Sequence, residues 1–137
     1  MSEKVIIAGD HSSPELKQRL RQHLEARGYR VEDLGTHSSE SVNYADFAEQ
    51  ACRKYLGGGY LFGVLICGTG IGISISANKI RNIRCALPQN RYAAEMAKQH
   101  NSANFIAFGA RIDYPESPES ILDAFLDAEF EGGRHSV

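Results

Sequence analysis

Short apolar runs alternate with segments of helical periodicity along the whole sequence. The apolar runs cover residues 5–9, 30–34, 60–67, 83–87 and 105–108. Runs of this length and composition are typical of β-strands. Between the first two, Leu16, Leu20 and Leu24 form one helical stripe that starts near Pro14 and stops at Gly28. This regular alternation of strand and helix predicts an α/β protein.

The remaining helices are predicted after residue 43, over residues 73–79 and 90–100, and from Pro118, which follows the capping hydroxyl of Ser117. Residues 60–67 form the most hydrophobic run and are typical of a central strand, whereas residues 30–34 alternate like a strand nearer an edge. Five such units predict a three-layer Rossmann-like (flavodoxin-like) fold, with a five-stranded parallel sheet and helices on both faces. At 137 residues, we expect one domain over residues 1–137.

Composition and charge narrow the class of protein. Fifteen Lys and Arg against 17 Asp and Glu give a net charge of −2, which disfavours nucleic acid as a partner. No stretch is long and apolar enough for a membrane span, and no signal peptide is visible. The cysteines number three and lack CxxC spacing, which argues against a disulfide framework and a zinc site. We therefore expect a soluble, cytoplasmic protein.

Cys67 is the leading candidate for chemistry. It closes the central predicted strand and precedes a loop with glycine at every second position. Free backbone N–H groups and the positive end of the next helix favour a thiolate there, and the same N–H groups can hold an anion. The alternative is a buried small hydrophobic residue, which is how we interpret Cys52 and Cys85.

The glycine loop does not match the common phosphate-binding motifs. A dinucleotide fingerprint requires G-x-G-x-x-G after the first strand, but here Ile73 takes the last glycine position and the loop follows the third strand. The Walker sequence G-x-x-x-x-G-K-[ST] is absent. A cysteine phosphatase would need an arginine where the chain again has Ile73. The loop therefore predicts an anion site beside a thiol, without an arginine of its own.

Other polar residues gain weight from their expected position. Asp10 and His11 follow the first strand, and His100 and Asn101 end the fourth helix. Taken alone, each pair is also explained as an ordinary loop or helix end. If both pairs lie at the same edge of the sheet, a functional role becomes the better interpretation of each pair. Three further candidates could bind phosphate, although lone cations are more often surface charges: Arg111, Arg134 and His135.

Several motifs together resemble one known family. They are Gly9-Asp10-His11, Leu34-Gly35-Thr36, residues 66–74 (ICGTGIGIS), Ala77-Asn78-Lys79, His100-Asn101, Phe108-Gly109-Ala110-Arg111 and residues 131–135 (EGGRH). This set is similar to the type B ribose-5-phosphate isomerases, a family that includes allose-6-phosphate isomerases and the subunits of galactose-6-phosphate isomerase. The resemblance covers nearly the whole chain.

The resemblance implies an aldose–ketose isomerase of the pentose phosphate pathway that interconverts ribose 5-phosphate and ribulose 5-phosphate. Cys67 would move a proton between C2 and C1 of the opened sugar through a cis-enediolate, without a metal or other cofactor. Thr69 would assist at the sugar oxygens. The enediolate charge would be stabilised by the backbone N–H groups of Gly68, Gly70 and Gly72 and by Asn101.

The resemblance also implies roles for residues outside the glycine loop. His100, helped by Asp10, would open the furanose ring, and Tyr44 would contact the sugar. Three cationic side chains would hold the phosphate: His11, Arg111 and Arg134. The partner would be a second copy of the chain, in a homodimer with shared active sites that could pair further into a tetramer.

Three alternatives stay open. The substrate could be a six-carbon aldose phosphate, such as allose 6-phosphate or galactose 6-phosphate, with pocket length deciding between them. A non-catalytic phosphosugar-binding module would use the glycine loop and the arginines but not the thiol of Cys67. A redox sensor would use the thiol alone, but no second cysteine is near Cys67 in the sequence.

Overall fold

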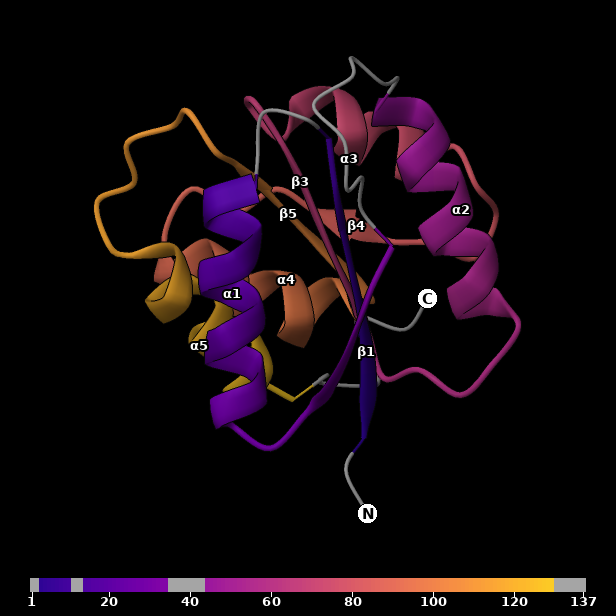
Figure 1. Ribbon diagram of the computed structural model, residues 1–137. Helices are drawn as coiled ribbons and strands as arrows, with labels where there is room; N and C mark the ends of the chain where they lie inside the picture. The colour runs from indigo at the N-terminus through magenta and orange to yellow at the C-terminus, as the bar shows by residue number, and fades with distance from the viewer. Residues whose placement is uncertain (1–2, 11–13, 35–43, 130–137) are drawn as a thin grey trace.

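The computed structural model describes residues 3–10, 14–34 and 44–129. Within these ranges, five strands alternate with five helices in the predicted order (Figure 1). They are β1 (Lys4–Gly9), α1 (Pro14–Ala26), β2 (Arg30–Asp33), α2 (Tyr44–Leu56), β3 (Gly63–Cys67), α3 (Ile71–Asn78), β4 (Cys85–Ala86), α4 (Arg91–Asn101), β5 (Phe105–Gly109) and α5 (Pro118–Asp127). None of these helices is long and apolar enough to cross a lipid bilayer. The predicted α/β class is confirmed.

The strands form one parallel sheet in the order β2-β1-β3-β5-β4. As predicted, β3 lies at the centre with all its residues buried, and β2 lies at an edge. In the flavodoxin order, 2-1-3-4-5, the fourth strand lies beside the third. Here β5 takes that place and β4 forms the second edge. The exchange sets Gly109 of β5 in register with Cys67 of β3.

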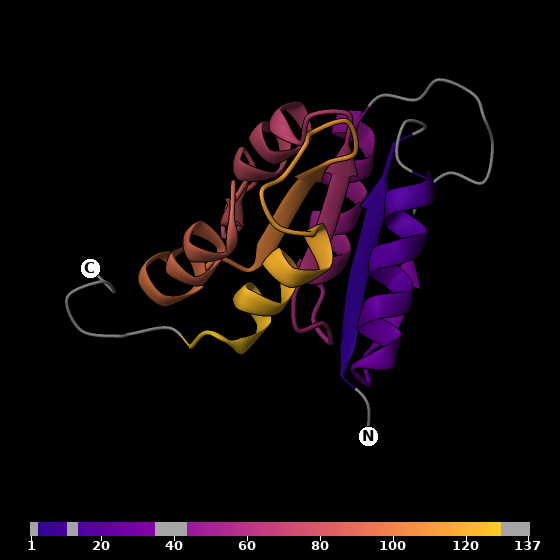
Figure 2. The same ribbon diagram turned by 90° about the vertical axis from the view of Figure 1, so that its left-hand side faces the viewer.

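Helices cover both faces of the sheet (Figures 1 and 2). α1, α4 and α5 share one buried apolar cluster with the sheet, and α2 and α3 share the other. Side chains alternate across a strand, so Ile66 belongs to the first cluster and Cys67 to the second. The three-layer arrangement is confirmed, and the Cys67 side chain lies on its α2–α3 side.

β4 is shorter than the strand predicted at residues 83–87, and a side chain binds its outer edge. The side-chain amide of Asn78 accepts the N–H of Cys85 at 2.7 Å and donates to the carbonyl oxygen of Cys85 at 2.8 Å. Asn104 Oδ1 accepts the backbone N–H of Arg84 at 2.8 Å on the side that faces β5. The amide of Asn78 therefore occupies backbone groups that an edge strand otherwise presents to another strand.

Two helices differ in how they begin. α5 starts as predicted, because the hydroxyl of Ser117 accepts the N–H of Ser120 at 3.1 Å. α3 starts at Ile71, two residues earlier than predicted. The reason is that Thr69 Oγ1 accepts the N–H of Ile71 at 3.2 Å and gives the first turn a side-chain partner.

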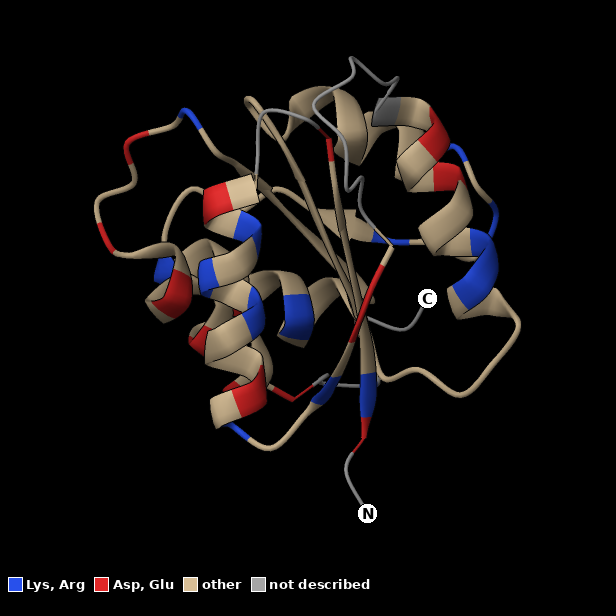
Figure 3. Cartoon of the chain, viewed as in Figure 1, with Lys and Arg blue, Asp and Glu red and all other residues tan. Residues whose placement is uncertain are grey.

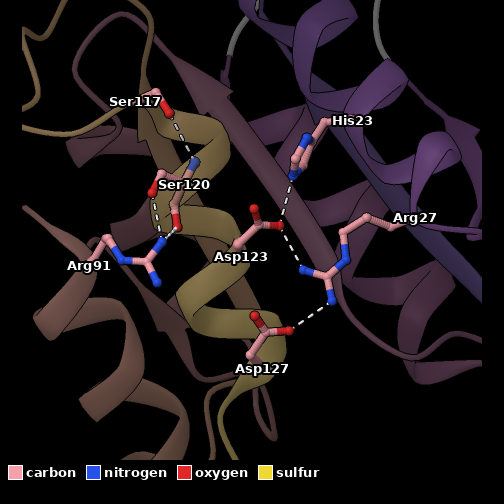
Figure 4. A network of polar contacts seen from close by, with 7 residues as sticks. All are labelled: His23, Arg27, Arg91, Ser117, Ser120, Asp123 and Asp127. Carbon is pink, nitrogen blue, oxygen red and sulfur yellow. Dashed lines mark hydrogen bonds and ion pairs between the residues drawn. The ribbon is translucent and has the colours of Figure 1, made fainter.

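A network of ion pairs joins α1 to α5 on the surface of the protein (Figure 4). Asp123 Oδ1 lies 2.7 Å from both His23 Nε2 and Arg27 Nη1, and Arg27 Nη2 lies 2.8 Å from Asp127 Oδ1. Burial alone would raise the pKa of Asp123, but the hydrogen bonds from His23 and Arg27 lower it overall. The network therefore holds the Asp123 carboxylate ionised and fixes α1 against α5.

Candidate active site

The loop after β3 places the thiol of Cys67 at the N-terminus of α3, as the sequence predicts. Cys67 Sγ accepts a hydrogen bond from the backbone N–H of Gly70 at 3.2 Å. The residue is 4% exposed and lies in the apolar cluster between the sheet and the α2–α3 layer. Burial alone fits a packed core cysteine. The hydrogen bond from Gly70 at the start of a helix distinguishes Cys67 from such a residue.

Two glycines let this loop lie close against the end of β5. Gly70 has φ +80°, in the left-handed region, and a Cβ there would lie 2.6 Å from Leu87 Cδ1 and 3.0 Å from the carbonyl carbon of Phe108. A Cβ on Gly109 would lie 2.6 Å from both the carbonyl carbon and the carbonyl oxygen of Thr69. A larger residue at either position would push the loop away from β5.

Backbone hydrogen bonds join three strand ends around the thiol. The N–H of Asp10 donates to the carbonyl oxygen of Ile66 at 3.1 Å, and the N–H of Ala110 donates to the carbonyl oxygen of Cys67 at 2.8 Å. The N–H of Arg111 donates to the carbonyl oxygen of Gly68 at 2.9 Å. The structure thus brings Asp10, Cys67 and Arg111 together at the carboxyl edge of the sheet.

The loop and the first turn of α3 form a surface suited to an anion. Thr69 is exposed, and Gly68 and Gly72 are half-buried. The first turn of α3 contains no acidic side chain, and Figure 3 shows the helix without charged residues. An anion at this end would meet the positive end of the helix and no acidic side chain of α3. Among the described residues, no three His, Cys, Asp or Glu side chains are grouped to hold a metal ion.

His100 and Asn101 lie at the opposite end of the strands from Cys67, at the amino edge of the sheet. They end α4, which leads into the amino end of β5, where the carbonyl oxygen of Asn104 accepts the N–H of Gly63 at 3.1 Å. From Gly63 to Cys67, β3 is about 13 Å long at 3.3 Å per residue. The common edge expected for Asp10 and His100 is therefore wrong within one chain, because a helix that follows a parallel strand runs back to the amino edge.

The structure tests the other predicted positions only in part. His11, Arg134 and His135 lie outside the described residues. Tyr44 is the first residue of α2, and this end of α2 lies near α3 in both views (Figures 1 and 2). The backbone of Tyr44 is thus on the side of the sheet toward which Cys67 points.

Comparison with known proteins shows the family of the chain. A family model described as Ribose/Galactose Isomerase matches residues 5–137. The chain belongs to this family. It is 44% identical to ribose-5-phosphate isomerase B of Escherichia coli over 132 residues, which are 96% of this chain and 89% of that protein. The family expected from the motifs is thereby confirmed.

Solved structures of ribose-5-phosphate isomerase B proteins have the same fold as this chain. The structure of Clostridium thermocellum ribose-5-phosphate isomerase B matches with a TM-score of 0.92 and 44% identity, over 97% of this chain and 90% of that one. That of ribose-5-phosphate isomerase B from Giardia lamblia matches with a TM-score of 0.86 and 48% identity, over 99% and 96% of the two chains. The flavodoxin-like class is confirmed as well.

Sequence reasoning missed one residue beside the site of this ribose/galactose isomerase. Tyr114 follows β5 by five residues, and its Oη accepts the N–H of Gly109 at 2.8 Å. Burial raises the pKa of Tyr114, the hydrogen bond from Gly109 lowers it, and the nearby Cys67 raises it further. A single tyrosine in a polar segment gives no sequence signal for such a contact.

The other two cysteines are structural, as predicted. Cys52 is fully buried in α2, and burial raises the pKa of its thiol to about 12. Cys85 packs beside the same cluster, and burial raises the pKa of its thiol as well. Neither thiol has the lowered pKa that is typical of reactive cysteines.

Proposed function

We propose that the protein interconverts ribose 5-phosphate and ribulose 5-phosphate, with Cys67 as the base. The observation that carries the proposal is the contact between Cys67 Sγ and the N–H of Gly70 at the start of α3, in a chain of the ribose/galactose isomerase family. The thiolate takes the proton from C2 of the open aldose, a cis-enediolate forms, and the proton returns to C1 while a proton moves from O2 to O1. The ketose results without any external oxidant or reductant.

The loop supplies what this step requires. Removing a proton beside a carbonyl group creates an oxyanion, and preorganised N–H donors lower such barriers by about 3 kcal/mol each. We assign this stabilisation to the N–H groups of Gly68 and Gly72, with Thr69 at the sugar oxygens. The N–H of Gly70, also expected to bind the substrate, instead donates to Cys67 Sγ. Asp10 and Arg111 lie at the same edge, which fits ring opening and phosphate binding there. We place His11 and Arg134 at the phosphate and Tyr44 at the sugar.

We further propose that each site is completed by a second copy of the chain. His100 and Asn101, assigned to ring opening and to the enediolate, lie at the wrong edge to reach the Cys67 of their own chain. Ile71 and Ile75 of α3, each 52% exposed, offer an apolar surface beside Thr69 for a partner. A homodimer with shared sites accounts for both observations, and two dimers could pair into a tetramer.

Mixing two inactive variants tests the shared site. Cys67→Ala and His100→Ala chains, co-expressed with different tags, form mixed dimers in which one site carries both changes and the other carries neither. A statistical mixture should regain about a quarter of the wild-type activity, since a twofold axis relates the two sites. Sites built within single chains would leave the mixture as inactive as either variant alone.

Solvent deuterium exchange tests the base. Cys67→Ala should abolish incorporation of deuterium at C2 of ribose 5-phosphate while leaving affinity for the sugar phosphate within a few fold, because the base acts in the transition state. Exchange and turnover close to wild type in the variant would remove Cys67 from the role. A non-catalytic binding module would show no exchange in the wild-type protein either.

A six-carbon aldose phosphate is the second candidate substrate, because the family model is described by both ribose and galactose. Assays with ribose 5-phosphate, allose 6-phosphate and galactose 6-phosphate side by side, under reducing conditions, decide between them. The reducing conditions matter because the described cysteines are all free, and a free thiol base fits a reducing compartment such as the cytoplasm.

A further inference from the structure

Tyr114 reaches back from the segment after β5 to the end of that strand. We propose that it is a positioning residue, which fixes the loop at residues 67–70 by holding Gly109. The proposal rests on the proposed function, because its effect on rate is exerted through Cys67 and Thr69. Tyr114 itself is placed in no contact with the sugar.

The first step is the anchoring of the phenol. The ring of Tyr114 packs edge-on against Phe108, with centroids 6.0 Å apart, and Oη accepts the N–H of Gly109 at 2.8 Å. Gly109 is buried, so its N–H group depends on this partner rather than on solvent. Burial raises the pKa of Tyr114, which keeps the phenol neutral while it accepts this bond.

The second step leads from Gly109 to the thiol loop. Gly109 is in register with Cys67, and the two residues that follow it donate backbone N–H groups to Cys67 and Gly68 at 2.8 and 2.9 Å. On its other side, Gly109 approaches Thr69 so closely that a single added Cβ would lie 2.6 Å from the carbonyl group of Thr69. A shift of Gly109 is therefore a shift of the loop.

The third step concerns the segment at residues 112–115, which few contacts hold in place. Residues 112–115 separate two pockets of about 450 Å³ each. One pocket is bordered by Thr69 and Leu87, and the other by Leu16 and Arg19. With open space on both sides, the segment is held by the Tyr114 anchor and by the hydrogen bond from the N–H of Ile112 to the carbonyl oxygen of Gly109 at 3.2 Å, and both connect its position to Gly109.

The experiment removes one oxygen atom. Tyr114→Phe keeps the ring against Phe108 and deletes the partner of Gly109. The matched control is Tyr29→Phe, in which the ring of a half-buried tyrosine packs edge-on against Phe62, 5.7 Å between centroids. We expect kcat for ribose 5-phosphate to fall about tenfold in Tyr114→Phe, with KM within twofold, since small displacements of reacting groups reduce rate steeply. The control should keep both constants.

Hydrogen exchange measured by mass spectrometry provides a readout that does not need turnover. Amides in residues 67–72 should exchange severalfold faster in Tyr114→Phe than in the wild type or the control, while those of β1 stay unchanged. Unchanged exchange at 67–72, or a wild-type kcat in a folded Tyr114→Phe protein, would overturn the proposal. A wild-type protein without isomerase activity would remove the proposed function, and the exchange comparison would then decide the role of Tyr114 alone.

Discussion

Replacing Gly109 with alanine tests how tightly the Cys67 loop must lie against β5. The new Cβ would stand 2.6 Å from the carbonyl carbon and oxygen of Thr69 and 2.6 Å from Ile112 Cγ1. Ordinary van der Waals contact starts at 3.4 Å, so strand and loop must separate by about 0.8 Å. The exposed Ile112 side chain can rotate away, whereas the backbone of Thr69 moves only with its loop.

The expected loss follows from that displacement. A misplacement of about 1 Å at the reacting groups costs on the order of 100-fold in rate, so kcat for Gly109→Ala should fall by about that factor. Overpacking of this kind costs about 1–3 kcal/mol of folding free energy, which leaves the protein folded in an assay at room temperature. Turnover of ribose 5-phosphate and urea unfolding are measured on the same preparation.

A second glycine serves as the control for this substitution. A Cβ on Gly57, at the far end of α2, would lie 3.3 Å from the carbonyl oxygen of Lys54, a contact that small adjustments relieve. Gly57→Ala should therefore keep kcat and change the free energy of unfolding by less than about 1 kcal/mol. A kcat for Gly109→Ala within threefold of wild type, alongside a clear loss of stability, would show that the clash is absorbed elsewhere and refute the reasoning.

Two further predictions concern charged contacts outside the site. Lys17 Nζ lies 3.0 Å from Asp33 Oδ1, with the side chains 11% and 13% exposed. Asp33→Ala leaves a buried ammonium group and should cost about 3–5 kcal/mol in urea unfolding. Lys17→Met should cost clearly less, because Arg21 Nη1 still lies 3.7 Å from Asp33 Oδ2. Equal losses would contradict this. Because the pKa of Asp123 is lowered in the folded state, its contribution is complete above the ordinary value of 3.8 and is lost as the pH falls through the folded pKa. Asp123→Asn should flatten the acid limb of thermal stability below the ordinary value of 3.8. An acid limb that is unchanged in the variant would show that Asp123 does not contribute to it.

Those parts of the candidate site that could be predicted depend on short sequence patterns. The position of Cys67 at the start of α3 was predictable because an apolar run ends in a thiol followed by alternating glycines. The order of β4 and β5 was not predictable, because two successive strand patterns carry no information on which lies beside β3. The edge at which His100 lies was misjudged by overlooking that α4 returns to the amino edge. Tyr114 was missed because its partner is a backbone N–H.

The exchange of β4 and β5 links these findings. It brings the loop after β5 to the thiol and leaves β4 as an edge, closed by Asn78 at the end of α3. α3 thus connects the Cys67 loop at its N-terminus to the β4 edge, where Asn78 and Asn101 line one pocket. In the proposed homodimer, the α4 end of each copy must lie at the Cys67 loop of the other. A twofold contact repeats itself, so a single mode of association completes both sites, and one intact site survives in every mixed dimer.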